Sequence, residues 1–248
     1  MNSVKSPLGD SINSLKSPLT YVMFWSGGWD STFLLLKTLW TTTKSIDTYY
    51  VGKIFKPQET LELQAIQTIL AEIEKHDVEK QKRVNFIYLK RPEITHGFYC
   101  SDVGKIIMDT RAKQQQDAKP HATYVPQLDL LIYFARILGL NHPAYGVETP
   151  AVPRTGCQSA IVNYVNDDDG LLSEEVDAMW HPLRILSFPI IKMTKADMYH
   201  EARRLGFLDI LNLARTCIHP HFKDNKMCGF CSSCKEVKPV PELSYRFQ

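Results

Sequence analysis

The chain has 248 residues, with 29 Lys and Arg against 27 Asp and Glu and a formal net charge of +2. Hydrophobic residues make up 44% and charged residues 23%, which is enough apolar surface for a buried core and excludes a largely disordered or fibrous chain. A charge this close to neutral provides no broad attraction for nucleic acid or for an anionic membrane, so either partner would require a local basic patch.

No apolar run approaches the roughly 20 residues that a membrane-spanning helix needs. The first twenty residues are polar and also lack the apolar stretch of a secretory signal. We therefore expect a cytoplasmic protein. The composition of residues 1–20, which repeat Lys-Ser-Pro-Leu twice, predicts a flexible N-terminal arm, and residues 21–248 are predicted to form a single domain.

Apolar runs of strand length alternate along the chain with segments of helical periodicity. Strands are expected over residues 21–25, 46–55, 84–89 and 144–147, and helices just after residue 30 and over residues 61–73 and 128–138. This alternation predicts an α/β fold, a doubly wound and mostly parallel sheet covered by helices. Further along, residues 185–191 restart the strand pattern, and Thr194 is expected to cap a helix that ends at Gly206. The segment from Glu148 to Asp169 is expected to be a loop.

A glycine-rich turn follows the first expected strand, with the sequence Ser-Gly-Gly-Trp-Asp-Ser-Thr over residues 26–32. Paired glycines let the backbone approach an anion, and the N–H groups and dipole at a helix start favour negative charge. The hydroxyls of Ser26, Ser31 and Thr32 would add donors, and Asp30 would orient magnesium or cap the helix. The turn therefore suits a phosphate group, although a tight capped turn also explains the glycines. The Walker A and G-x-G-x-x-G motifs are absent, which weighs against an ordinary kinase or Rossmann dehydrogenase.

Four cysteines cluster near the end of the chain. They are Cys217, Cys228, Cys231 and Cys234. Short C-x-x-C spacings let thiolates share one ion, and four thiolates close a tetrahedral zinc shell with no position left for catalysis, so a structural role is expected. An iron–sulfur cluster uses the same ligands and stays open as an alternative. Cys100 and Cys157 stand alone and are interpreted as small core residues.

The glycine-rich turn resembles the S-G-G-x-D-S loop of the PP-loop ATP pyrophosphatases, which bind ATP and release pyrophosphate while they adenylate a substrate. This resemblance implies that the loop holds the β and γ phosphates. The implied nucleotide-binding residues are Ser26, Gly27, Gly28, Asp30, Ser31 and Thr32. The segment 188–195 is also similar to a late segment of these enzymes, in which a lysine neighbours the phosphates. Asp30 and Lys195 are therefore the expected catalytic residues, and ATP and Mg²⁺ the expected cofactors.

Combined with the loop, the cysteine tail over residues 217–234 resembles the zinc-binding end of the 7-cyano-7-deazaguanine synthase (QueC-like) family of the queuosine pathway. The resemblance implies a PP-loop ligase that converts 7-carboxy-7-deazaguanine and ammonia to a nitrile with ATP, through adenylated intermediates. Zn²⁺ would be held by the four cysteines. The expected partners are the small-molecule deazapurine and ammonia, with no strong signal for nucleic acid and none for a membrane; a homodimer stays open.

The middle of the chain departs from the family pattern. Leu128-Asp129 stand where the family usually has Arg-Asn, residues 53–63 lack its Gln-Arg-His element, and residues 147–157 replace an Asp/Ser/Tyr-rich segment. The resemblance therefore indicates the ATP chemistry more firmly than it indicates the substrate. One alternative is a PP-loop tRNA-modifying enzyme that adenylates a base or another carboxylate, with Cys157 as sulfur carrier; the near-neutral charge weighs against it. The other alternative is a module that senses a nucleotide without turning it over.

Overall fold

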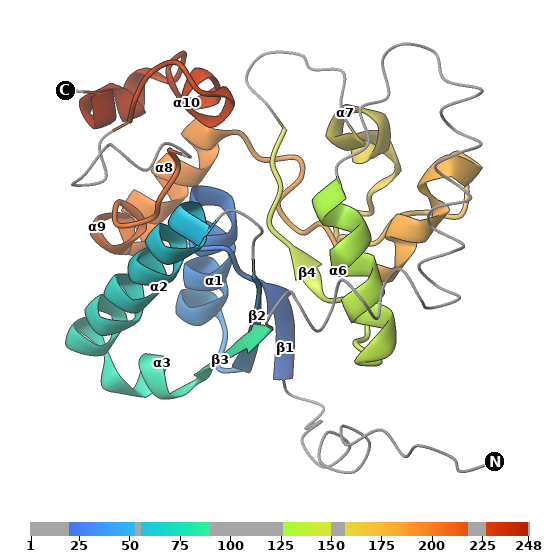
Figure 1. Ribbon diagram of the computed structural model, residues 1–248, viewed down its shortest axis with the longest axis horizontal. Helices are drawn as coiled ribbons and strands as arrows, with labels where there is room; N and C mark the ends of the chain where they lie inside the picture. Colours follow the sequence, from blue (N-terminus) through green and yellow to red (C-terminus); the bar gives the residue numbers. More distant parts are fainter. Residues whose placement is uncertain (1–19, 53–55, 90–125, 150–156, 218–226, 248) are drawn as a thin grey trace.

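The computed structural model describes residues 20–52, 56–89, 126–149, 157–217 and 227–247 (Figure 1). The main elements, in chain order, are β1 (Thr20–Phe24), α1 (Trp29–Thr41), β2 (Ser45–Val51), α2 (Lys56–His76), α3 (Val78–Lys82), β3 (Val84–Leu89), α6 (Pro126–Ile137), β4 (Ala144–Tyr145), α7 (Cys157–Ile161), α8 (Lys195–Leu205), α9 (Leu208–Leu211) and α10 (Ser232–Val237). Three 3₁₀ segments are η1 (Val162–Tyr164), η2 (Ala178–Ile185) and η3 (Pro241–Phe247). The predicted N-terminal arm lies outside the described residues up to residue 19, and Thr20 already belongs to β1.

The four strands form a parallel sheet in the order β3-β2-β1-β4. The chain steps outward from β1 to β2 and β3, then crosses to the other side of β1 to form β4. This reversal confirms the predicted doubly wound α/β class. The expected strand over residues 185–191 is reduced to isolated bridges of Ser187 with Ala144 and with Leu171, because Ile185 still belongs to η2 and the residues after Phe188 turn away.

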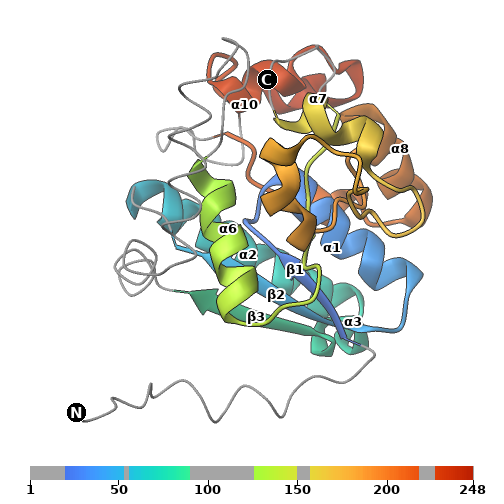
Figure 2. The same ribbon diagram turned by 90° about the vertical axis from the view of Figure 1, so that its right-hand side faces the viewer.

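Helices cover both faces of the sheet, with α1 and α2 on one side and α6 on the other (Figures 1 and 2). Side chains alternate between the two faces along a strand. Accordingly, Met23 of β1 packs in the cluster that contains α1, whereas Phe24 packs in the cluster that contains α6. The first cluster also takes in α8, α9 and the four cysteines of the tail, so the tail is part of the same core as α1.

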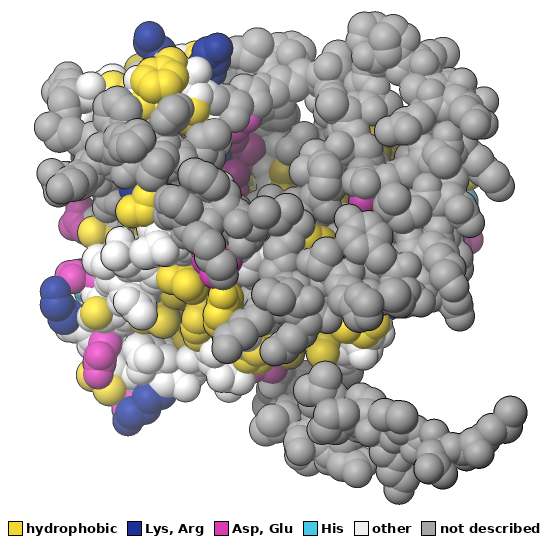
Figure 3. Space-filling model, in the orientation of Figure 1, with side chains coloured by type: hydrophobic (Ala, Val, Ile, Leu, Met, Phe, Trp, Pro, Cys, Tyr) yellow, Lys and Arg dark blue, Asp and Glu magenta, His cyan; other side chains and the backbone are white. Residues whose placement is uncertain are grey.

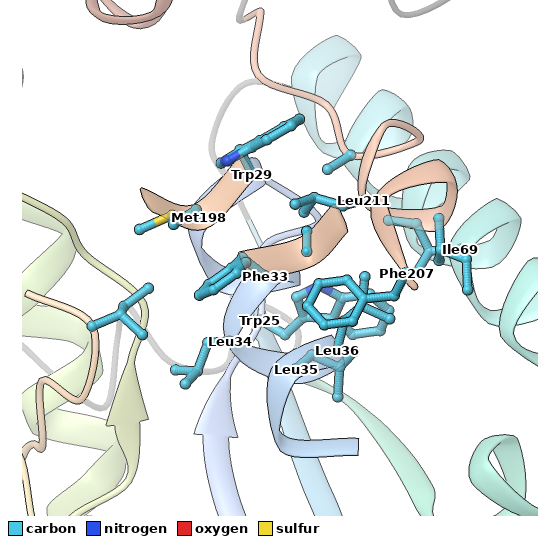
Figure 4. Packing of buried hydrophobic residues seen from close by; sticks show 14 of the residues in the cluster. Trp25, Trp29, Phe33, Leu34, Leu35, Leu36, Ile69, Met198, Phe207 and Leu211 are labelled. Carbon is cyan, nitrogen blue, oxygen red and sulfur yellow. The ribbon is translucent and has the colours of Figure 1, made fainter. Parts of the chain in front are cut away.

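Helix α1 is apolar on most of its sides because it is enclosed by the sheet, α8 and α9. Trp29 lies at its first turn, with Phe33 one turn further along (Figure 4). The rings of Phe33 and Phe207 lie 5.9 Å apart at a tilted angle, a favourable geometry for aromatic pairs. This packing fixes the position of the glycine-rich turn, which is continuous with α1.

Helix α8 confirms the predicted caps at both ends. The Thr194 side chain accepts a hydrogen bond from the N–H of Asp197, whose carboxylate accepts one from the N–H of Thr194, and Gly206 ends the helix at φ +79°. Such a capping box satisfies two N–H groups that a helix start leaves open. The reciprocal cap determines where α8 begins, and its first residue is Lys195.

The segment expected to be a loop over residues 148–169 contains two short helical pieces, α7 and η1. Residues 150–156 lie outside the described part. Pieces of three to five residues carry too little periodicity to be recognised in a sequence. Among the described helices, none combines the length and the apolar character that crossing a bilayer requires.

Candidate active site

The glycine-rich turn starts α1 without a side-chain cap. Gly28 is the N-cap residue and makes no side-chain cap hydrogen bond, and Asp30 lies inside the first turn, so the prediction that Asp30 caps the helix is wrong. The Ser31 hydroxyl accepts from the N–H of Ser26 at 3.2 Å and lies 3.2 Å from the Ser26 hydroxyl. Gly27 has φ +71°, a left-handed conformation that favours glycine. The turn is thus held by its own hydroxyls, which fold back beneath the helix start.

The first N–H groups of α1 are unused among the described residues. The N–H of Thr32 donates to the Gly28 carbonyl at 2.9 Å, whereas the N–H groups of Trp29, Asp30 and Ser31 donate to no described group. Unpaired N–H groups at a helix start, together with the helix dipole, form an anion-binding arrangement. The turn therefore offers the donors that a phosphate group needs.

A pocket of about 260 Å³ opens beside this turn. It is lined by Phe24, Trp25, Ser26, Gly28, Trp29, Asp30, Ser31, Tyr49, Tyr50, Val51, Leu131, Tyr145, Gly146 and Ser233. These residues come largely from the carboxyl ends of β1, β2 and β4, and the strand order reverses between β1 and β4. Open α/β sheets bind their ligands at such a reversal. Among the described lining residues, Asp30 is the single charged one.

Two of the predicted nucleotide-binding residues do not line the pocket. The Thr32 hydroxyl faces the interior, where it accepts from the ring N–H of Trp25 at 3.0 Å. Gly27 packs on α2, and a Cβ there would lie 3.0 Å from the Glu62 carbonyl and from Ile66. The structure thus brings Ser26, Gly28, Asp30 and Ser31 to the pocket, while Gly27 and Thr32 shape the turn.

Lys195 lies under the turn, between two carboxylates. Its Nζ pairs with Asp30, and Oε1 of Glu148 lies 2.8 Å away. The Lys195 side chain is 3% exposed and that of Glu148 is 7% exposed, whereas Asp30 is 27% exposed. The two predicted catalytic residues are therefore brought into direct contact, with the Asp30 carboxylate at the boundary between the buried lysine and the pocket.

The buried position of this group shifts two of its pKa values. Burial and the nearby charge of Asp30 raise the pKa of Glu148 to about 8, although Lys195 opposes the shift. Burial alone would lower the pKa of Lys195, but Asp30 and Glu148 raise it above its usual value. Near neutral pH the buried group therefore holds a charged lysine, and Glu148 ionises less readily than an ordinary glutamate.

Sequence reasoning missed Glu148 and also Gly146. A Cβ on Gly146 would lie 2.7 Å from Cα and 2.9 Å from the backbone nitrogen of Ser31, so the end of β4 touches the first turn of α1 and leaves no space for a side chain. Gly146 directly follows the short strand β4, and Glu148 lies two residues further along. The signal that could have identified them is their position at the carboxyl end of a parallel strand, where ligand-binding residues gather.

The sulfur atoms of the four clustered cysteines lie close together. All four Sγ atoms lie within 4.8 Å of one another, and those of Cys228 and Cys234 are 3.6 Å apart. Bonds of about 2.3 Å in a tetrahedral zinc site place sulfurs about 3.8 Å apart, so the cluster fits zinc. Burial would raise the pKa of Cys228, but N–H groups of Cys231 and Phe230 point at its sulfur and bring the pKa to about 7. A thiol with this pKa is easily deprotonated for metal binding.

The family model described as "Queuosine biosynthesis protein QueC" matches residues 20–239. The chain belongs to the QueC family. The match contains the glycine-rich turn, Lys195 and all four clustered cysteines, and it ends before η3. The predicted family is confirmed, and membership places the chain among the enzymes of queuosine biosynthesis, which act on small molecules. A search of curated proteins found no match.

In this QueC family chain, the cysteine tail is built directly against the glycine-rich turn. The N–H of Arg215, two residues before Cys217, donates to the Gly27 carbonyl at 2.9 Å. Ser233, between Cys231 and Cys234, lines the pocket. The two motifs are almost 190 residues apart in the sequence, yet they form one site.

Described cationic side chains are dispersed on one face of the molecule. On the face shown in Figure 3, Lys and Arg lie at separate places around the rim and form no continuous patch. Several are paired with acids, as in the contacts of Lys192 with Asp167 and of Arg184 with Glu174. The described residues of this face of the QueC family chain therefore form no basic stripe of the kind that long nucleic acids require.

Proposed function

We propose that the chain catalyses the ATP-dependent conversion of 7-carboxy-7-deazaguanine and ammonia to 7-cyano-7-deazaguanine, through adenylated intermediates. It would thus be a nitrile-forming ligase of the QueC family. The observation that carries the proposal is the start of α1, where unused N–H groups of Trp29, Asp30 and Ser31 adjoin a pocket at the reversal of the strand order. Family membership supplies the substrate class.

The turn would bind the β and γ phosphates of ATP. The substrate carboxylate attacks the α-phosphorus, the bond between the α-phosphorus and its bridging oxygen breaks, and pyrophosphate leaves with the electron pair. Negative charge grows on the departing group, and prearranged N–H donors such as those of α1 stabilise that charge without reorganising. The hydroxyls of Ser26 and Ser31 lie at the same turn and would add donors.

Ammonia then displaces AMP from the acyl adenylate and gives the amide. A second ATP adenylates the amide oxygen, and loss of that oxygen with AMP, together with two N–H protons, leaves the nitrile. The partly exposed Asp30 carboxylate fits Mg²⁺, which prefers oxygen ligands. That ion would neutralise phosphate charge during both transfers. Lys195 would fix the orientation of Asp30 and balance its charge, because the lysine is buried beneath it.

Zn²⁺ would have a structural role. Four thiolates complete its coordination and leave no open position for water or substrate. The clustered sulfurs and the contact between Arg215 and Gly27 support a role in holding the tail against the turn.

Product analysis tests the proposal. The protein is incubated with ATP, Mg²⁺, ammonia and 7-carboxy-7-deazaguanine, and AMP and the nitrile are measured by mass spectrometry. Asp30→Ala is expected to lower AMP formation by at least about 100-fold, in line with the loss of an electrostatic contact in the transition state, with an unchanged zinc content. Asp167→Ala, which removes an exposed surface carboxylate, is the matched control. Full AMP formation by Asp30→Ala would contradict the proposed role.

The same assay separates the alternatives. An enzyme that adenylates a tRNA base would release AMP with tRNA and not with the deazapurine, and it would require Cys157, the first residue of α7, as a sulfur carrier. A nucleotide sensor would bind ATP and release no AMP. The dispersed cations among the described residues of the face in Figure 3 favour the small-molecule reaction over the tRNA reaction.

A further inference from the structure

Arg246 is a buried cation in η3 that reaches both chain segments leading into the cysteine cluster. Its Nη2 donates to the carbonyl of Ala214, three residues before Cys217, at 2.7 Å. Its own carbonyl accepts from the N–H of Met227, the residue before Cys228, at 3.0 Å. Arg246 therefore connects the two segments that carry the first two cysteines of the cluster.

The same side chain touches the start of α1. The Arg246 Cζ lies 4.9 Å from the ring centroid of Trp29, and guanidinium groups are attracted to the face of an indole ring at this distance. Trp29 is 2% exposed and is the first residue of α1, at the turn end of the helix (Figure 4). One side chain thus contacts both the metal-bearing segments and the turn proposed to bind phosphate.

The guanidinium has no carboxylate partner in the described part of the chain. Arg246 is 5% exposed and its Nη1 has no hydrogen-bond partner there. Burial lowers the pKa of Arg246, and the ionised forms of Tyr245 and Cys234 would raise it. Tyr245 stays neutral at physiological pH because burial raises its pKa. A buried cation without a counter-charge is strongly unfavourable, so among the described groups that act on Arg246 the cysteine cluster is the remaining source of negative charge.

We propose that Arg246 is a positioning residue of the metal centre: its buried guanidinium balances the net negative charge of four metal-bound thiolates and couples the centre to the start of α1 through Trp29. Four thiolates outweigh the charge of Zn²⁺, and coordination removes their protons outright. Arg246 lies beyond the family match, which ends at residue 239, so family membership does not assign it this role. The inference depends on zinc at the proposed site but not on the proposed reaction.

Zinc competition tests the proposal. The zinc-loaded protein is titrated with a chromophoric chelator, and the affinity for zinc is compared among three variants. Arg246→Met removes the charge but keeps an apolar stem, and we expect a loss of about 10–100-fold in zinc affinity, as for other residues that support metal ligands. Arg246→Lys keeps the charge and should lose only a few-fold. Arg204→Met removes an exposed arginine that pairs with Glu201 and should match the native chain.

A second measurement is made on the native chain and needs no substitution at Arg246. Removing zinc should change the fluorescence of Trp29, because the guanidinium above its ring loses its counter-charge. The chain has four tryptophans, and Trp29→Phe should abolish the zinc-dependent part of the signal.

Three results would overturn the proposal. The first is a zinc affinity of Arg246→Met within twofold of the native value, and the second is an unchanged Trp29 signal on zinc removal. The third is an Arg246→Met variant that binds a non-hydrolysable ATP analogue more weakly while its zinc affinity is unchanged. The last result would assign the guanidinium to the pocket. Metal analysis separates this inference from the proposed reaction: a native chain that forms AMP and the nitrile but carries no zinc overturns the inference alone.

Discussion

Two buried cations contact consecutive residues at the start of α1, and they are stabilised in opposite ways. Lys195 pairs with Asp30 and Glu148. Arg246 lies over Trp29 and has no carboxylate partner among the described residues. The charge of Lys195 is balanced as soon as the polypeptide folds, whereas Arg246 depends on a cluster that carries negative charge only when its thiols ionise. The same helix turn is therefore fixed by the fold on one side and, under the proposal for Arg246, by metal loading on the other.

Zinc removal should destabilise the surroundings of Arg246 much more than those of Lys195, and this is the largest effect that we expect. When free zinc exceeds its Kd by about 1,000-fold, binding to the folded state alone contributes about 4 kcal/mol to the free energy of unfolding. Chelation should remove that contribution and increase amide hydrogen exchange in residues 227–247 and around Ala214. Exchange in α8, which carries Lys195, should change least. Equal deprotection of α8 and of the tail would show that the two regions respond as one.

Replacing Lys195 should have the next largest effect. Lys195→Met leaves Asp30 and Glu148 without their shared cation, and removing one partner of a buried ion pair costs about 3–5 kcal/mol. Urea unfolding measures this loss. Lys192→Met is the matched control, because Lys192 forms an exposed pair with Asp167 and such pairs contribute at most about 1 kcal/mol. Similar losses in both variants would show that Lys195 is not held by its carboxylates.

Glu148 should make the free energy of unfolding depend on pH. Its pKa is about 8 in the folded chain against a usual 4.5, so the folded state binds the proton more tightly. This contribution is complete below about pH 4.5 and is lost as the pH rises toward 8, with a slope of at most about 1.4 kcal/mol per pH unit.

Glu148→Gln should abolish that slope, because the amide resembles the protonated acid and does not titrate. Denaturant unfolding between pH 5 and 8.5 measures the difference from the native chain. The exposed Glu174, which pairs with Arg184, provides the control variant Glu174→Gln, whose profile should follow the native one. A slope that persists in Glu148→Gln would assign the titration to another group.

The smallest effect concerns the cap that places Lys195. Thr194→Ala removes the hydroxyl that accepts from the N–H of Asp197, and losing an N-cap hydroxyl costs about 1 kcal/mol. The capping box also lowers the pKa of Asp197, so Thr194→Ala should raise that pKa, which NMR titration detects. Thr194→Ser should behave like the native chain, since serine keeps the hydroxyl.

The sequence predicts the parts of the fold that depend on local pattern. The third strand was expected over residues 84–89, the bounds that β3 has. The α8 caps at Thr194 and Gly206 were also correct, because cap chemistry and a left-handed glycine act within a few residues. The glycine-rich turn and the spacing of the cysteines identified the family for the same reason.

Contacts through space could not be predicted from local pattern. Lys195 and Asp30 lie 165 positions apart, and nothing near Lys195 in the sequence indicates that two carboxylates enclose it. Glu148 follows a strand of only two residues, where alternation is too short to read. Arg246 has an ordinary local sequence, and its role follows only from the packing of η3 against the segments that carry the cysteines.

Gly146 has a consequence for how substitution experiments on this chain should be interpreted. Any side chain there would collide with the backbone of Ser31, and overpacking of this kind typically costs about 1–3 kcal/mol or forces the neighbouring backbone to move. A mutational scan scored by enzyme output would therefore rank Gly146 beside Asp30, although it contributes no donor, acceptor or charge of its own side chain. Loss of activity on substitution of Gly146 would therefore report how closely β4 approaches α1, and not a chemical role of residue 146.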